Sequence, residues 1–149
     1  MSHAERVRGL SGQDIAPSRW VMVDQAAINL FADATQDQQW IHTDPERAAR
    51  ESPFGATVAH GMFTASLAPR LALEVLELLD SPLIINYGLN KVRFPAALEA
   101  GTNVRLNLRV GDVIDVQGGV RTTLHASMEA EGVERPVCVA EFLLQIGHG

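Results

Sequence analysis

The sequence has little cysteine and no excess of positive charge, and each shortage excludes a class of function. Cys138 is the only cysteine in 149 residues, so neither an intrachain disulfide nor a cluster of thiolate metal ligands is available. Its neighbours Val137, Val139 and Ala140 predict a buried strand and an unreactive core thiol. The formal net charge of −6 argues against a nucleic-acid partner, because phosphate binding usually requires a basic face.

The sequence also lacks a segment that a membrane would hold. No apolar signal-peptide core follows Met1, where the prominent residues are His3, Glu5, Arg6 and Arg8. The longest apolar segment is short and becomes charged towards its end, which does not suit a bilayer span. We therefore expect a cytoplasmic protein with no membrane partner.

The length and composition favour one globular domain. A chain of 149 residues suits a single core, and 46% hydrophobic with 20% charged residues is typical of globular proteins. No internal repeat, linker or low-complexity tract is present. We expect residues 1–16 to form a flexible, irregular N-terminal arm and residues 17–149 to form the domain.

The segment from Ala59 to Leu79 organises the predicted fold. After His60 its charged residues are few, and apolar residues occupy nearly every face. A helix with this pattern belongs inside a protein. From Gly61 to Leu79 it would be roughly 28 Å long. Its first turn would be a buried helix N-terminus, whose free N–H groups need partners.

Helices are predicted before this segment and strands after it. A short strand at 18–23 precedes a helix capped by Asp24, residues 35–41 form a loop, and Asp44-Pro45 begins a short helix. Extended segments are predicted at 83–94 with an interruption at 86–90, and at 104–110, 113–116, 120–130 and 136–146. A bend is expected at Gly111-Asp112, and turns at Gly118-Gly119 and Glu131-Gly132. This order lacks βαβ alternation and predicts an α+β fold, an antiparallel β-sheet wrapped around the long central α-helix.

The densest polar cluster beside apolar residues is the segment 35–42, which contains Asp37 and His42. A carboxylate and an imidazole held together can orient a water molecule and move its proton. In the alternative interpretation, Asp37 satisfies N–H groups of the loop and His42 is an ordinary surface or core histidine. The spacing of the two residues does not separate these alternatives.

Gly61 offers a second chemical feature at the start of the central helix. Its N–H would lie at the positive end of the helix and could donate to a carbonyl oxygen that gains negative charge. Alternatively, glycine stands there because of the backbone shape of a loop-to-helix junction. His60 is expected to be structural, with a hydrogen bond to the loop.

A longer set of residues resembles a known family. The set comprises Phe31, Ala32, Thr35, Asp37, Ile41, His42, Asp44 and Ala48, then Ser52-Pro53-Phe54-Gly55, Val58-Ala59-His60-Gly61 and Ser66-Leu67. It resembles the hydratase motif of the MaoC-like family, and within that family the (R)-specific enoyl-CoA hydratases. The segment Asn86 to Pro95 is similar to the one that follows the central helix in a short, single-hotdog branch.

The resemblance implies a fold, a reaction and an assembly. The fold would be a hotdog, and two chains would form a homodimer with their sheets joined edge to edge. Asp37 and His42 would activate one water, which adds to C3 of a trans-2-enoyl thioester while C2 gains a proton on the same face. Gly61 N–H would hold the thioester oxygen, and the product would be an (R)-3-hydroxyacyl thioester. No metal or cofactor is implied, because the thioester is the electron sink and coenzyme A, or an acyl carrier, is part of the substrate.

One dipeptide departs from the family pattern. Many relatives carry Asn-Pro where this chain has Gln39-Trp40. Gln39 keeps an amide that can orient the loop. Trp40 is much larger than proline, so we expect a change in the shape of the loop and in the width of the pocket.

Further residues are predicted to contact the substrate. Those expected at the acyl pocket are Trp40, Phe54, Met62 and Phe63, and Gln39, His60 and Ser66 are further expected substrate contacts. Those expected at the coenzyme phosphates are Lys91 and Arg93, then Arg105 and Arg109. The apolar members suit core packing equally well, and the basic ones suit a solvated sheet face. Ser66 has the alternative of a hydrogen bond to the carbonyl of Met62, and Pro69 is expected to kink the helix.

Two other functions compete with hydration. Hotdog proteins include acyl-CoA thioesterases, in which water attacks the carbonyl carbon and frees a thiol. A non-catalytic partner subunit of a dehydratase complex is the other alternative. The combination of Asp37, His42 and Gly61 favours the hydratase.

Overall fold

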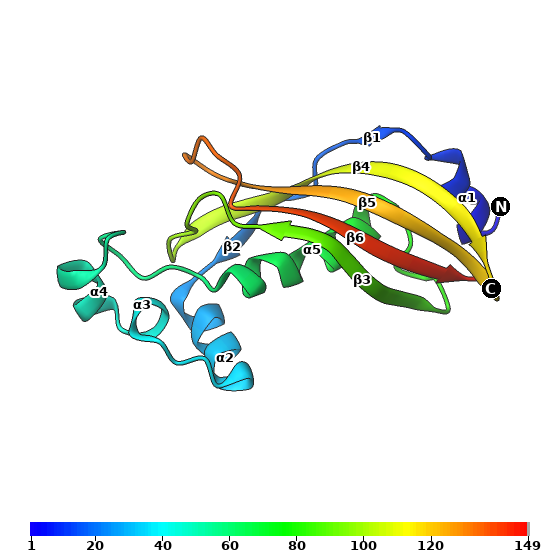
Figure 1. Ribbon diagram of the computed structural model, residues 1–149. Coiled ribbons are helices and arrows are strands. Elements are labelled where there is room, and N and C mark those ends of the chain that lie inside the picture. Colours follow the sequence, from blue (N-terminus) through cyan, green and yellow to red (C-terminus); the bar gives the residue numbers. More distant parts are fainter. Residues whose placement is uncertain (149) are drawn as a thin grey trace.

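The computed structural model describes residues 1–148, in which a curved antiparallel sheet surrounds one helix (Figure 1). The helices are α1 (His3–Gly9), α2 (Gln25–Thr35), α3 (Trp40–Thr43), α4 (Pro45–Glu51) and α5 (Gly61–Val75). The strands are β1 (Asp14–Ile15), β2 (Val21–Val23), β3 (Ile84–Arg93), β4 (Thr102–Val116), β5 (Gly119–Ala130) and β6 (Cys138–Gly147). Among these described residues, no helix has both the length and the apolar character that a membrane crossing requires.

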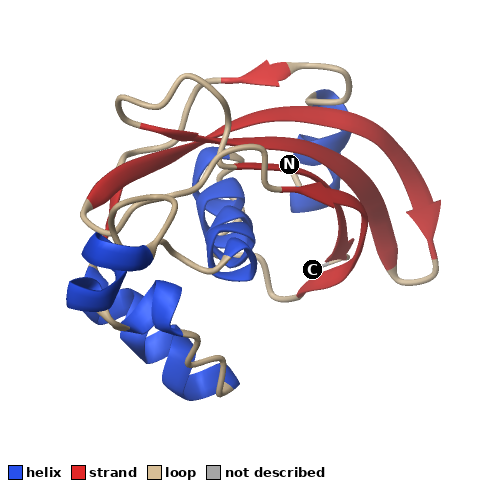
Figure 2. Ribbon diagram, turned by 60° about the vertical axis from the view of Figure 1, so that its left-hand side comes forward, coloured by secondary structure: helices blue, strands red, loops and turns tan. Residues whose placement is uncertain are grey.

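The sheet curls over α5, and β3 forms one of its edges. Its strands run in the order β1-β4-β5-β6-β3, β2 also pairs with β4, and every pairing is antiparallel. Figure 2 shows the red strands bending around the central blue helix, while α2, α3 and α4 project to one side. The predicted α+β class, with an antiparallel sheet around a central helix, is confirmed.

The core lies between the concave face of the sheet and α5. On β4, Val104, Leu106, Leu108 and Val110 are buried, as the alternating pattern predicted. The buried residues of α5 are mostly small, namely Thr64, Ala65, Ala68, Leu71 and Ala72, so the helix can approach the sheet closely. Cys138 is buried too, and this burial raises the pKa of its thiol to about 11, which agrees with an unreactive core thiol.

The central helix is shorter than predicted. It continues through Pro69 but ends at Val75 instead of Leu79, because Glu77 adopts a left-handed conformation with φ of 55°. The Leu78 N–H then donates to the carbonyl of Leu73, which is a Schellman ending. This reversal buries Leu78 completely. The pattern alone suggested a longer helix because glycine, the usual residue at such an ending, is absent.

The prediction of a loose, irregular arm at residues 1–16 was wrong. Ser2 and Glu5 form a capping box at the start of α1, and Val7 on this helix is fully buried in the core. After the helix, β1 pairs with β4. Arg6 and Arg8 form ion pairs with Glu77 and Asp115, which lie far along the chain. The sequence did not predict this helix as part of the core because most of its residues are polar and only Ala4 and Val7 are buried.

Of the other local predictions, the two helix caps and the bend at Gly111 are confirmed, and the loop at 35–41 and the interruption at 86–90 are corrected. Asp24 and Asp44 cap α2 and α4 as predicted, and a register shift interrupts the β4–β5 pairing around Gly111. The predicted loop at 35–41 instead ends in the short helix α3, which carries His42. β3 runs through the predicted interruption at 86–90, with register shifts in its pairing with β6.

The burial of α1 gives a direct test of the revised boundary. We expect Val7→Ala to lower the free energy of unfolding by about 2 kcal/mol, because it removes buried methyl groups and leaves a cavity. Ile114→Ala is the matched control, since Ile114 is 51% exposed and its truncation should cost less than about 0.5 kcal/mol. Urea unfolding of both variants measures the difference, and equal stabilities would mean that α1 is not part of the core.

Candidate active site

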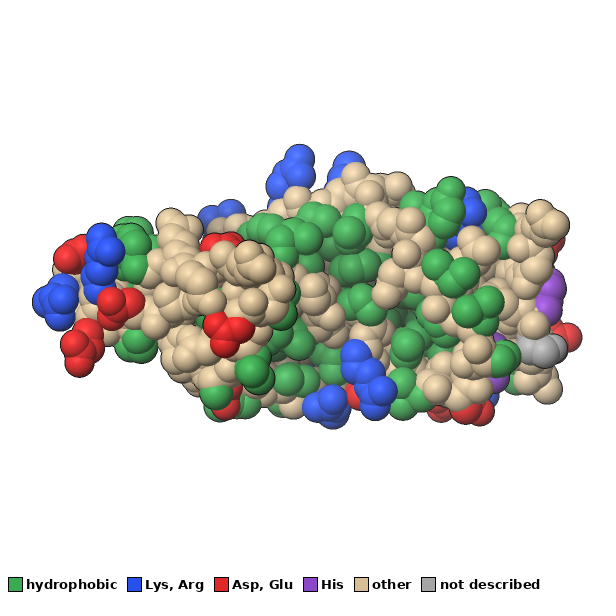
Figure 3. Space-filling view, turned by 90° about the horizontal axis from the view of Figure 1, so that it is seen from below, with side chains coloured by type: hydrophobic (Ala, Val, Ile, Leu, Met, Phe, Trp, Pro, Cys, Tyr) green, Lys and Arg blue, Asp and Glu red, His purple; other side chains and the backbone are tan. Residues whose placement is uncertain are grey.

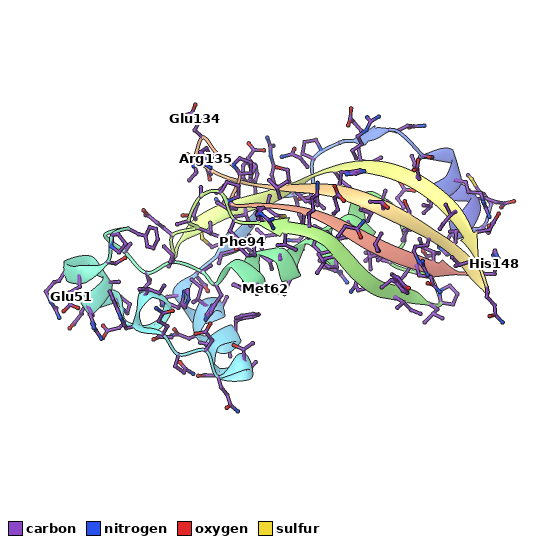
Figure 4. The ribbon with its side chains drawn as sticks, viewed as in Figure 1. Glu51, Met62, Phe94, Glu134, Arg135 and His148 are labelled. Atoms are coloured by element: carbon purple, nitrogen blue, oxygen red, sulfur yellow. The ribbon has the colours of Figure 1, made fainter. Side chains whose placement is uncertain are left out.

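The three predicted catalytic residues line one pocket. The pocket holds about 290 Å³ and is lined by Phe31, Thr35, Asp37, His42, His60, Gly61, Met62 and Phe94. Its walls come from the end of α2, the loop after it, α3, the start of α5 and the residue that follows β3. In Figure 4, Met62 lies on the first turn of α5 and Phe94 at the end of β3 beside that turn.

His42 is held in one tautomer by a backbone carbonyl. The side chain is buried, and its Nδ1 lies 2.6 Å from the carbonyl oxygen of Val58. Since a carbonyl only accepts hydrogen bonds, Nδ1 carries the hydrogen. In the neutral ring, Nε2 is then the acceptor. Gln25 fixes the α3 turn as well, because its side-chain amide donates to the His42 carbonyl at 2.7 Å.

His60 links the loop of Asp37 to the ring of His42. Its Nε2 lies 3.0 Å from the backbone carbonyl oxygen of Asp37, so this nitrogen carries the hydrogen and donates it. The two imidazole rings stack with centroids 3.9 Å apart and planes at 24°, and Phe31 packs against His60 at 4.8 Å. The expected hydrogen bond from His60 to the loop is therefore present. Within residues 1–148, the buried Nδ1 of His60 has no hydrogen-bond partner.

Asp37 presents its carboxylate at the exposed side of the pocket. Its backbone is held by His60 on the carbonyl and by the Thr35 hydroxyl on the N–H, at 3.4 Å. One ligand-type atom from each of Asp37, His42 and His60 lies within 4.8 Å of the others. One nitrogen of each ring donates to a backbone carbonyl, and the other is left free to accept.

Gly61 is required by a close approach between two elements. A Cβ built on Gly61 would lie 2.6 Å from Cδ2 of Phe94, closer than two carbon atoms can pack. The backbone φ of Gly61 is not positive, so glycine stands here because a side chain would lack space and not because the backbone conformation requires it. As the first residue of α5, Gly61 also has an N–H without a partner inside the helix.

The structure separates the predicted substrate contacts into two groups. Met62 and His60 line the catalytic pocket, and Phe54 lines a neighbouring pocket that meets it at the start of α5. The remaining predicted substrate contacts line neither of these two pockets. Trp40 lies under the Arg47 guanidinium at 4.3 Å, and the Ser66 hydroxyl donates to the Met62 carbonyl, the alternative noted above.

The remaining predicted contacts lie in the core, on the sheet or at a helix end. Gln39 precedes α3, and its backbone carbonyl accepts from the N–H of His42. Phe63 packs against the core and Phe31. Lys91 and Arg93 are exposed on β3, where Arg93 donates to the Val92 carbonyl. Arg105 is paired with Glu129, and Arg109 with Asp14.

Sequence reasoning gave no site role to three residues of the pocket, Phe31, Thr35 and Phe94. Phe31 and Thr35 do belong to the family motif, so the signal was present for both. Phe94 lies 33 positions after Gly61, and its contact with that residue is created by the fold (94 − 61). Phe94 also belongs to the segment Asn86 to Pro95 that resembles the family, but only the fold shows that it contacts Gly61.

Comparison with known proteins identifies the family. The model of the MaoC like domain matches residues 7–131. The chain belongs to this family. It is 47% identical over 136 residues to the 3-hydroxyacyl-thioester dehydratase Z of Mycobacterium tuberculosis strain H37Rv. The aligned region covers 91% of this chain and 89% of that protein. The expectation of a hydro-lyase of the dehydratase type is confirmed by this kinship.

Solved structures confirm that this MaoC-like chain has the hotdog fold. The (R)-hydratase from A. caviae involved in PHA biosynthesis superposes with a TM-score of 0.75 at 23% identity, over 91% of this chain and 96% of that one. The HadBC complex of Mycobacterium tuberculosis, a (3R)-hydroxyacyl-ACP dehydratase, superposes with a TM-score of 0.72 at 19% identity. The match covers 91% of this chain and 96% of that one.

The hydrogen bonds of the two histidines generate a testable assignment. Near neutral pH, we expect His42 to be the Nδ1–H tautomer and His60 the Nε2–H tautomer, because each donates to a carbonyl oxygen. Long-range ¹H–¹⁵N correlation spectra of the imidazole rings distinguish the tautomers. The exposed His125 serves as the reference for an unrestrained ring. An Nε2–H form of His42 would contradict the geometry of the site.

Proposed function

We propose that this MaoC-like protein adds water to trans-2-enoyl-CoA and forms (R)-3-hydroxyacyl-CoA, a reaction that also runs in reverse as dehydration. The observation that supports it is the meeting, in one pocket, of the Asp37 carboxylate, the acceptor nitrogen of His42 and the first N–H of α5 at Gly61. In this proposal the Asp37 carboxylate orients the water, the acceptor nitrogen of His42 is the base, and the Gly61 N–H is the oxyanion donor.

The distances suit a single shared water molecule. A water that hydrogen-bonds to two groups, each at about 2.8 Å, can join atoms up to roughly 5.6 Å apart. The ligand-type atoms of Asp37 and His42 lie within 4.8 Å of each other. In the proposed arrangement one water bonds to the Asp37 carboxylate and to Nε2 of His42, the ring nitrogen that the Val58 carbonyl leaves free.

Each group has a defined part in the proposed hydration. The water oxygen bonds to C3 while His42 Nε2 accepts a proton from the water and Asp37 holds the water in place. The electron pair of the C2–C3 double bond moves towards the thioester oxygen, where Gly61 N–H and the positive end of α5 stabilise the charge. The protonated His42 ring then gives this proton to C2 on the same face, which restores the thioester and returns the pair to its starting protonation state. The thioester acts as the electron sink, so the reaction needs no other cofactor.

A homodimer is the proposed assembly. β3 is the last strand of the sheet, and its exposed side chains include Ile85, Tyr87 and Leu89. Figure 3 shows hydrophobic side chains gathered across the middle of the face seen from below. An unpaired edge strand with exposed apolar residues favours pairing with another chain, and a second copy offers the same edge.

The competing functions make different demands on the site. A non-catalytic subunit needs none of the three groups, yet all three line the pocket of this chain. A thioesterase would direct the water at the carbonyl carbon and release free thiol. Product analysis therefore distinguishes hydration from hydrolysis.

The decisive experiment measures hydration of crotonyl-CoA by loss of its conjugated absorbance, together with thiol trapping and the chirality of the product. We expect Asp37→Asn and His42→Gln to lower kcat by about 10²- to 10⁴-fold, because each removes a proton-transfer or water-orienting group.

Asp112→Asn and His125→Gln make the same chemical changes on exposed sheet residues outside this pocket, and both should keep the wild-type rate. Full activity of both site variants, or thiol release that matches the loss of absorbance, would overturn the proposed reaction.

A further inference from the structure

His60 is a buried polar side chain that the proposed reaction does not use. Only 3% of its surface is exposed, and its Nδ1 has no hydrogen-bond partner among residues 1–148. A buried nitrogen without a partner lowers the stability of the fold, so an apolar ring would suit this position better. A polar group kept at such a cost calls for a reason in the site that it lines.

The place of His60 in the fold indicates that reason. It is the N-cap residue of α5, where a short side chain normally accepts from the first helical turn, but the His60 side chain makes no cap hydrogen bond. Its Nε2 instead donates to the backbone carbonyl of Asp37 at 3.0 Å, and its ring stacks on His42 with centroids 3.9 Å apart. One side chain therefore contacts both members of the proposed catalytic pair.

We propose that His60 is a positioning residue for the hydration, and that it acts through two separate contacts. Its N–H holds the backbone of Asp37, and its ring restrains the ring of His42. The carboxylate of Asp37 and Nε2 of His42 then face the same water. This inference rests on the proposed function and extends it to a residue that takes no part in the proton transfer.

The geometry leaves His60 without a proton-transfer role. Its Nε2 carries a hydrogen that the Asp37 carbonyl accepts, and its Nδ1 is buried. A proton on Nδ1 would add a buried charge beside the His42 ring, which itself becomes charged when it takes the proton of the water. A neutral His60 ring, in contrast, can stack on His42 in both of its protonation states.

Both contacts add a restraint that the neighbouring hydrogen bonds lack. The Val58 carbonyl accepts from His42 Nδ1 at 2.6 Å, but a single hydrogen bond leaves the ring free to tilt about that nitrogen. The stacked His60 ring limits this tilt. The bond from the Asp37 N–H to the Thr35 hydroxyl is long, at 3.4 Å, so the His60 bond at 3.0 Å is the firmer restraint on the Asp37 backbone.

Three substitutions separate the two contacts. His60→Gln keeps an N–H donor and removes the ring, His60→Phe keeps a ring and removes the donor, and His60→Ala removes both. With crotonyl-CoA, kcat should fall about tenfold in each of the first two variants and about 10²-fold in His60→Ala, because small misplacements of reacting groups slow the chemical step. KM should stay within about threefold of the wild-type value, since no contact with the substrate is removed.

The imidazole N–H signal of His42 reports the restraint on its ring without turnover. The Nδ1–H of His42 is buried and hydrogen-bonded, so its exchange with water should be slow enough for detection by NMR. His60→Phe should keep this signal, and His60→Ala should lose it through faster exchange, because the stacked ring no longer covers His42. His125→Ala, the same change on an exposed residue of β5, should leave kcat and the signal at wild-type values.

Other roles of His60 give different results. A rise of KM by tenfold or more with unchanged kcat would make it a substrate contact, and equal losses of kcat in all three variants would make the imidazole itself necessary, as proton transfer requires. Either result overturns the inference, and so does a kcat of His60→Ala within about twofold of the wild type. If His60→Ala does not fold, His60→Gln and His60→Phe carry the test, and wild-type kcat in both would contradict it.

Failure of the proposed function is recognised separately. If the wild type does not hydrate crotonyl-CoA while the His42 signal responds to the substitutions as expected, the reaction is overturned and the positioning of His42 by His60 is supported. If the wild type is active and neither kcat nor the signal changes in the variants, the positioning role is overturned and the reaction stands.

Discussion

The contact between Gly61 and Phe94 is the constraint on which the site depends. The ring of Phe94 occupies the space that any Cβ at Gly61 would need, so the end of β3 reaches the backbone at the start of α5. This approach brings an N–H with no partner inside the helix to the junction of two pockets. A side chain at position 61 would displace Phe94 and change both pockets together.

The second constraint is the use of backbone carbonyls to orient the histidines. Val58 lies in the segment that leads to α5, and Asp37 lies in the loop after α2, so the two hydrogen bonds join separate parts of the chain. The stacked rings then connect these parts at 3.9 Å. Because the bonds fix which nitrogens carry hydrogen, His42 presents an acceptor to the pocket without help from a charged partner.

The sequence predicted the features that depend on short-range patterns. The central helix, the alternation on β4, the caps at Asp24 and Asp44 and the irregularity at Gly111 all follow from local periodicity or local hydrogen bonding. Asp37, His42 and Gly61 were named from their spacing and from the family motif, and the fold brings them to one pocket.

Features created by distant contacts could not be predicted. α1 is amphipathic over a few residues, and its ion pairs with Glu77 and Asp115 cross most of the chain. The end of α5 depends on Glu77 in a left-handed conformation, which no local rule favours for glutamate. Phe94 enters the site only because β3 ends beside α5, and the neighbouring pocket has the same origin.

Gln39-Trp40, the dipeptide that departs from the family pattern, lies at the start of α3 and outside the residues that line the catalytic pocket. Trp40 is the first residue of α3, a position at which proline is favoured because its fixed φ suits a helix start and its missing N–H costs nothing. The requirement at this position is therefore a helical φ and not a proline ring. The indole turns towards Arg47 and does not line the catalytic pocket, so its size does not narrow the space for substrate. The α3 turn, and with it the position of His42, is instead held by Gln25 and Val58.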